Sequence, residues 1–134
     1  MSRLRFLAVA LALGAAACGS DPVTPTPTTS VTVTDTFSGT LTRNGATTSP
    51  FTTAASGTVT ATISSLSPDS TLVVGLALGV WNGNSCQIVF SKDTATQFSQ
   101  VQGAVSSAGS LCVRLYDVGN LIDPATYEVQ VNHP

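Results

Sequence analysis

Short runs of alternating apolar and polar residues fill the chain from residue 31 onward and constrain its fold more than any other feature. In residues 58–64, for example, Val59, Ala61 and Ile63 share one face of an extended segment. Because successive side chains of a strand point to opposite faces, this spacing predicts half-buried β-strands. Threonine and valine are abundant in the region, and the helix-favouring residues glutamate and lysine are nearly absent, which also favours strands.

The alternation predicts about eight strands in roughly 100 residues. They are residues 34–43, 49–53, 58–64, 71–81, 86–91, 96–102, 111–116 and 126–131. Turn signals separate them, and Asn82-Gly83 predicts a tight type I′ hairpin, which needs positive φ at both central positions. We therefore expect an all-β, antiparallel β-sandwich of the jelly-roll or Greek-key kind, whose strand order the sequence leaves open.

Residues 1–17 have the organisation of an export signal peptide. Arg3 and Arg5 precede an uninterrupted apolar run of 12 residues from Phe6 to Ala17. This run is too short to span a bilayer and fits the apolar region of a signal.

The signal ends in Ala15-Ala16-Ala17 followed by Cys18. Small residues before a cysteine resemble a bacterial lipobox, in which the cysteine is lipidated and becomes the mature N-terminus. Ordinary cleavage after Ala17 is the alternative, since Ala-x-Ala is also a common cleavage pattern. We expect lipidation at Cys18. The following Gly19 resembles the signal for delivery to the outer membrane of the bacterial cell envelope.

The cysteine count supports this expectation. The chain has three cysteines, and in an oxidising compartment two of them should pair. We predict a disulfide between Cys86 and Cys112, 26 positions apart, with two buried free thiols as the alternative. Closing such a loop stabilises the fold by about 3–4 kcal/mol in the chain-entropy estimate. Lipidation then accounts for Cys18.

The remaining organisation is simple. Residues 18–30 carry Pro22, Pro25 and Pro27 among threonines and predict an extended tether. Residues 31–134 are expected to form one domain. From residue 18 onward there are 3 basic and 7 acidic residues, a net charge of 3 − 7 = −4, which disfavours nucleic-acid binding.

The chain lacks the usual side chains of catalysis. His133 is its single histidine, and we expect it to be a solvated residue of the C-terminal tail, which leaves no catalytic triad and no zinc ligand set. We predict no catalytic residue, no metal and no cofactor. The alternative is an envelope hydrolase that uses acidic residues of the loop from Asp117 to Asp123, although both also suit turn positions.

A speculative ligand platform comes from strand parity. Trp81, Arg114 and Tyr116 are each expected on the sheet face opposite the apolar residues of their strands. If these faces adjoin, two aromatic rings and a guanidinium suit a sugar or peptide ligand. The alternative is that Trp81 covers the disulfide.

A family resemblance appears in four segments. Residues 108–117 (AGSLCVRLYD) resemble the "aG-x-Y-x-v-r-V-y" segment of bacterial pre-peptidase C-terminal domains, and residues 125–131 (ATYEVQV) resemble their closing strand. Residues 36–41, and Phe51 with residues 57–60, resemble the opening strands. The resemblance spans about residues 34–131 and implies a jelly-roll-like sandwich that usually follows the catalytic domain of a secreted peptidase.

Some members of that family bind calcium or collagen, but we carry neither site over. Asp35 is the only acidic residue between Val31 and Pro68, whereas calcium needs several oxygen ligands. We therefore expect a stand-alone lipoprotein without enzymatic activity. Its N-terminal lipid would anchor it to the membrane, and it would act as a binding, adhesion or structural module for a glycan or protein. An accessory subunit of a secreted hydrolase is the alternative, and the oligomeric state stays open.

Overall fold

The computed structural model describes residues 19, 22–26 and 29–134. The predicted signal peptide and Cys18 lie outside these residues, as do residues 20–21 and 27–28 of the predicted tether. Residues 22–26 of the tether are exposed and belong to no strand. Within the part of the chain that is described, no helix is long and apolar enough to cross a membrane.

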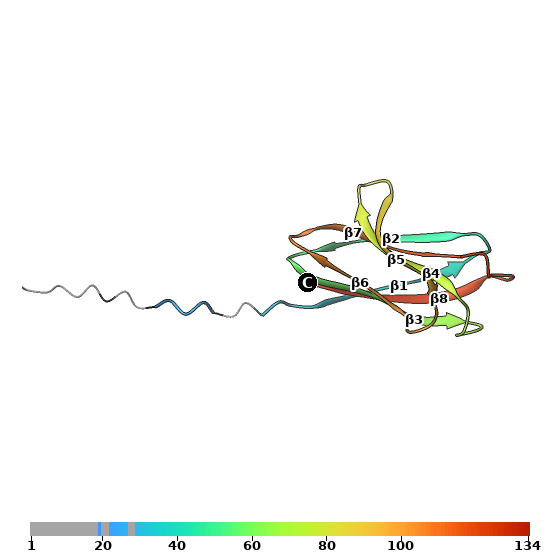
Figure 1. The fold of residues 1–134 in the computed structure, drawn as a ribbon, viewed down its shortest axis with the longest axis horizontal. Helices are drawn as coiled ribbons and strands as arrows, with labels where there is room; N and C mark the ends of the chain where they lie inside the picture. The colour runs from blue at the N-terminus through green and yellow to red at the C-terminus, as the bar shows by residue number, and fades with distance from the viewer. Residues whose placement is uncertain (1–18, 20–21, 27–28) are drawn as a thin grey trace, which may run out of the picture.

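The domain is an eight-stranded β-sandwich (Figure 1). Its strands are β1 (Val33–Leu41), β2 (Ala46–Thr53), β3 (Gly57–Ser67), β4 (Val74–Trp81), β5 (Cys86–Ala95), β6 (Gln100–Val105), β7 (Gly109–Tyr116) and β8 (Ala125–His133). Sheet A has the order β1-β8-β3-β6 and sheet B the order β2-β7-β4-β5, with every pair antiparallel. This is the strand order of a jelly roll, so the predicted all-β sandwich is confirmed.

The core lies between the two sheets and follows the alternation in the sequence. Ile63 of β3 and Val131 of β8 are fully buried from sheet A, and Leu76 of β4 and Leu115 of β7 are buried from sheet B. Removing a side chain of this size from water stabilises the fold by about 1.5–3 kcal/mol.

Several predicted strand boundaries are wrong: β1 ends at Leu41, β4 begins only at Val74, and β2, β3 and β5 are longer than predicted. The sixth strand shows the physical reason most clearly. Residues 96–99 form a turn, and β6 begins only at Gln100. Phe98 has a φ of 68°, Ser99 N–H donates to the Thr96 carbonyl at 3.0 Å, and Ser99 Oγ accepts from Thr96 N–H. A non-glycine residue with positive φ interrupts the strand that the β-favouring composition predicted.

The hairpin between β4 and β5 also differs from its prediction. A loop of four residues, 82–85, replaces the two-residue type I′ turn, and only Gly83 in it has positive φ. The side-chain oxygen of Asn82 accepts from the N–H groups of Asn84 and Ser85 at 3.0 and 2.8 Å, so the asparagine organises the loop.

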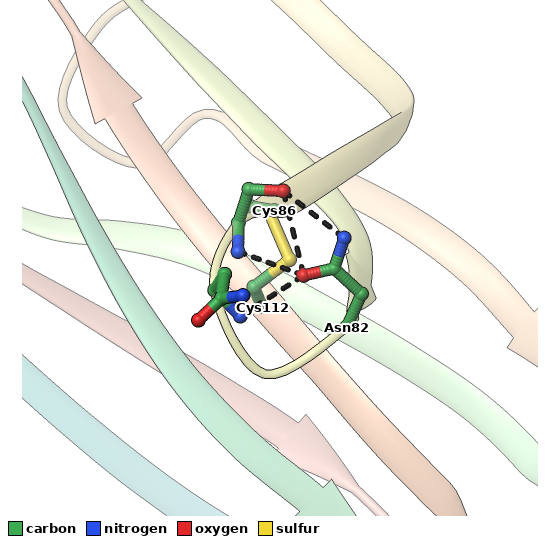
Figure 2. The surroundings of a disulfide bond; sticks show 5 residues. Asn82, Cys86 and Cys112 are labelled. Atoms are coloured by element: carbon green, nitrogen blue, oxygen red, sulfur yellow. Dashed lines mark hydrogen bonds between the residues drawn. A yellow bond between two sulfur atoms is a disulfide. The ribbon is translucent and has the colours of Figure 1, made fainter.

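This hairpin lies directly beside the predicted disulfide, which is present (Figure 2). Cys86 begins β5 and Cys112 lies in β7, with their Cα atoms 5.8 Å apart. β4 lies between those two strands, and its Gly79 pairs with Cys112. The bridge therefore links the edge strand β5 to β7 across the outer face of β4.

The register gives the sandwich two distinct ends. At one end β1 begins, Val33 pairs with His133, and Ala54 N–H of sheet B donates to the Pro134 carbonyl at 3.0 Å. We call this the tethered end, because the chain from the predicted tether joins β1 there. It carries the loops of residues 54–56, 82–85 and 106–108, and the opposite, free end carries those of residues 42–45, 68–73, 96–99 and 117–124.

His133 corrects one prediction. It is 4% exposed rather than solvated, because β8 continues past Val131 and keeps the histidine in register with β1. Its Nε2 lies 3.0 Å from Asp35 Oδ2, and its ring centroid is 5.2 Å from that of Phe51. The single histidine thus fastens the last strand to the first.

The disulfide is testable by removal. Replacing both Cys86 and Cys112 by alanine should lower the free energy of unfolding by about 3 kcal/mol, because the cross-link no longer restricts the unfolded chain. Urea denaturation monitored by circular dichroism measures this. Reducing agent should lower the stability of the wild type to about that of the double variant and leave the variant unchanged. A wild type that resists reduction and a variant of equal stability would contradict the assignment.

Candidate functional site

A groove lies on the outer face of sheet B, and small residues of β4 make room for one of its lining side chains. Gly75, Ala77 and Gly79 occupy alternate positions on that face and are all buried. A Cβ on Gly75 would lie 2.1 Å from the ring of Tyr116, and one on Gly79 would lie 2.2 Å from the Gln87 carbonyl oxygen. The side chain of Tyr116, which lines the groove, can therefore lie over β4 because Gly75 has no side chain.

The walls of the groove come from three elements. Arg114 and Tyr116 project from β7, Ile88 and Ser91 from β5, and Asn44 and Asp117 lie in loops at the free end. The groove is open to solvent, and its volume of about 320 Å³ has room for one sugar residue or a short peptide segment. Polar groups line most of it.

Tyr116 is fixed in the groove by a hydrogen bond. Its hydroxyl donates to Oδ1 of Asp93 in β5. This hydrogen bond crosses β4, which lies between β7 and β5 in the sheet. Burial raises the pKa of Tyr116, and the hydrogen bond and negative charge of Asp93 raise it further, while Ser91 and the positive charge of Arg114 oppose this. The phenol is therefore neutral at physiological pH, and the ring presents an aromatic surface in a set orientation.

Arg114 is the cation of the groove. It pairs with Ala77 of β4 and with Thr48 of β2, so small neighbours leave room beside its half-buried side chain. Within residues 29–134 its guanidinium forms no ion pair and no hydrogen bond; the one ion pair found there joins His133 to Asp35. Five N–H donors are thus available to a ligand.

Asp117 closes the free end of the groove, and its carboxylate is occupied by the backbone. Oδ1 accepts from the N–H groups of Gly119, Asn120 and Leu121 at 2.9–3.1 Å, and Oδ2 accepts from Asn44 N–H at 2.8 Å. Burial alone raises the pKa of Asp117, but the four N–H donors together bring it below its usual value. Asp117 is therefore a carboxylate that holds two loops in place.

The three residues of the predicted platform do not come together. Arg114 and Tyr116 line one groove, as expected, whereas Trp81 lies at the tethered end opposite Cys86. Trp81 lies six positions along β4 from Gly75, the partner of Tyr116, which corresponds to about 20 Å along the strand. Trp81 instead lies next to the disulfide.

Sequence reasoning missed Ser91, Asp93 and Asn44. The register between β4 and β5 shifts twice, so parity counted from Cys86 does not predict which side chains of β5 join the groove. The turn signal Asn44-Gly45 located its loop, but the loop reaches the groove only because Asp117 binds it.

Neither acidic residue of the predicted loop is placed for paired acid–base work with the other. Asp117 is bound by backbone donors, and Asp123 is exposed and accepts no hydrogen bond from the described residues. In that same part of the chain, no three His, Cys, Asp or Glu side chains are close enough to share a metal ion.

Comparison with known proteins adds no identification. No protein family matches this chain, and no curated protein matches it. The likeness to pre-peptidase C-terminal domains rests on the segments given above and stays a prediction.

The role of Asp117 has a pH signature. Asp117→Ala should lower the free energy of unfolding by about 2 kcal/mol at neutral pH, because four backbone donors lose a charged acceptor. A carboxylate with a lowered folded pKa stabilises the fold above its unfolded pKa of about 3.9, and this contribution is lost as the pH falls through the lower folded value.

The difference between wild type and Asp117→Ala should therefore shrink below about pH 4. Urea denaturation at several pH values measures it. Asp123→Ala is the matched control, since that carboxylate lies in the same loop without such donors, and it should change stability little at any pH. A difference that persists unchanged in acid would contradict the role of the charge.

Proposed function

We propose that this protein is a lipid-anchored, non-enzymatic module of the bacterial cell envelope that binds an acidic glycan in the groove of sheet B. The observation that carries the proposal is Arg114, a half-buried cation beside an ordered aromatic ring with no ionic partner among the described residues. The carboxylates of the same groove, Asp93 and Asp117, accept hydrogen bonds from Tyr116 and from the backbone.

The cysteines support the anchor. The disulfide uses Cys86 and Cys112, which leaves Cys18 as the remaining cysteine of a chain with three. Disulfides persist in oxidising compartments, where an exported protein is found. A thioether to lipid at Cys18 accounts for the third cysteine at the position where the signal peptide ends.

The chemistry of the groove supports an acidic sugar as the ligand. A guanidinium binds a carboxylate through two parallel hydrogen bonds. An aromatic ring with one polar end suits the apolar face of a pyranose. Arg114 and Tyr116 supply these two contacts from alternate positions of one strand, so the ring and the carboxylate of a uronic-acid unit can be held together.

Binding to polyuronic acids tests this proposal. The full chain should retain polygalacturonate in preference to neutral glucan, and added salt should weaken the interaction. Arg114→Gln should reduce affinity by about tenfold or more, because the charge-assisted hydrogen bonds are lost. Isothermal titration calorimetry measures the affinity, and thermal unfolding shows whether the variant keeps its stability.

Arg43→Gln is the matched control, since Arg43 is an exposed arginine at the same end and does not line the groove. It should bind like the wild type. Equal affinity for acidic and neutral polymers, or equal losses in the two variants, would contradict the proposed role of Arg114.

The anchor has its own test. Mass spectrometry of the membrane-extracted protein should show acyl groups on Cys18 as the N-terminal residue, and Cys18→Ser should release the protein from the membrane fraction. A soluble wild-type product that begins at Cys18 with a free thiol would contradict lipidation.

A further inference from the structure

Charge is distributed unevenly between the two ends of the sandwich. Between Val33 and His133 the charged residues are Asp35, Arg43, Asp69, Lys92, Asp93, Arg114, Asp117, Asp123 and Glu128. Only Asp35 lies in the half of its strand nearer the tethered end, and it is paired with His133. The other eight lie in the free half or its loops.

The three loops at the tethered end also lack charged residues. They are Ala-Ala-Ser at residues 54–56, Asn-Gly-Asn-Ser at residues 82–85 and Ser-Ser-Ala at residues 106–108. All are small and uncharged, so this end approaches an apolar or anionic surface without removing a charge from water.

A group of exposed apolar side chains also lies in the half nearer the tethered end, while Phe98 and Ile122 are exposed singly in loops of the free end. Val80, Ile88, Val89 and Phe90 are each 44–59% exposed, and we call them the apolar rim. Gly79 pairs with Ile88 and Leu78 pairs with Phe90, so Val89 is the extra residue of a β-bulge. The edge strand β5 is exposed on both faces from Gln87 to Thr94, so its three successive apolar side chains all contact solvent.

The apolar rim borders a cleft between the edge strands of the two sheets. The cleft has a volume of about 190 Å³, and its walls include Val89 and Phe90 from β5 and Gly103 and Val105 from β6. The apolar surface therefore extends from the rim into the sandwich.

The rim also lies toward the end of the sandwich where the chain leaves for its anchor, because Val80 and Ile88 lie within three residues of the loop of residues 82–85 at the tethered end. Fourteen residues, 19–32, separate Cys18 from β1. An extended, proline-rich chain of that length reaches at most about 43 Å. A lipid on Cys18 thus keeps this end at an effective concentration of order millimolar near the bilayer, where a weak contact suffices.

We propose that the tethered end docks through the apolar rim on the surface of the bilayer that holds the lipid of Cys18. This rests on the proposed lipidation. The rim and Trp81, which follows Val80 in β4, then sit at the headgroup level, where aromatic and apolar side chains are favoured. The free end of the groove, at Asn44 and Asp117, then faces away from the membrane, and the groove meets the rim at Ile88.

A bilayer fits these observations better than a second copy of the chain. Pairing between two β5 edges needs a regular row of backbone groups, and the bulges in β5 interrupt that row. The missing charges matter most against an anionic lipid surface, which would repel carboxylates.

Trp81 makes the proposal measurable, because it is the single tryptophan of the chain. The lipidated full-length protein is reconstituted in vesicles of phosphatidylcholine and phosphatidylglycerol, with and without bromine near the start of the acyl chains. Docking predicts that brominated lipid quenches Trp81 emission and that vesicles protect it from aqueous acrylamide. Lipidated protein without either effect would overturn the docking while leaving the anchor intact. Absence of lipid on Cys18, seen by mass spectrometry, would remove its basis.

Val89→Asp should lower the ratio of docked to free protein about tenfold, since it replaces an apolar contact by a charge that the headgroups repel. Phe98→Asp is the matched control, because Phe98 is 71% exposed but lies at the free end. Val89→Thr keeps the branched side chain and should give an intermediate loss, so the test survives if the aspartate variant unfolds. Equal quenching in all three variants would overturn the role of the rim. So would protection of Trp81 that depends on protein concentration in the absence of lipid, which would assign the rim to a second copy.

Discussion

The central strand β4 is covered on both faces, and this constraint sets the form of the rest of sheet B. Val74, Leu76 and Leu78 face the core, so the outer face of the strand is left to Gly75, Ala77 and Gly79. Gly75 lies beneath the ring of Tyr116, Ala77 pairs with Arg114, and Gly79 lies beneath the backbone of Gln87 in β5. A larger residue at Gly79 would meet that backbone and could not be accommodated by a side-chain movement, so the position of Tyr116 and the path of β5 both depend on this run of small residues.

The jelly-roll strand order also gives the molecule two ends that differ in charge. Loops that alternate along the chain gather at opposite ends, so charged and uncharged loops separate even though they alternate in sequence. The Asn44 loop and the loop after β7 meet through Asp117, although they are 73 positions apart. The uncharged loops collect where the chain joins its tether. The proposed orientation toward a membrane and the position of the groove would therefore both follow from this one topology.

Periodicity in the sequence was sufficient for the fold class and for most strands, because burial of alternate residues such as Val59 and Ile63 leaves a direct trace in the pattern. The pairing of Cys86 with Cys112 was also predictable, since few cysteines compete. The pairing register between strands could not be predicted from the sequence. The register shift at Val89 places an extra residue in β5, and the positive φ of Phe98 ends a β-favouring run, and composition encodes neither. His133 illustrates the same limit: its burial follows from the extra residues of β8 that pair with β1.

The placement of the binding groups on strands rather than on loops affects how such a module works. Arg114 and Tyr116 alternate on β7, which is hydrogen-bonded to β2 and β4 on its two sides, so little backbone freedom is lost when a ligand binds. The free end of the groove depends on loops, but the carboxylate of Asp117 ties them with four N–H donors. Under the proposed function, a rigid but shallow site of this kind would give modest affinity for one sugar unit. Many copies anchored in one membrane and facing one polymer would gain avidity without further contacts, so the proposed anchor would contribute to binding.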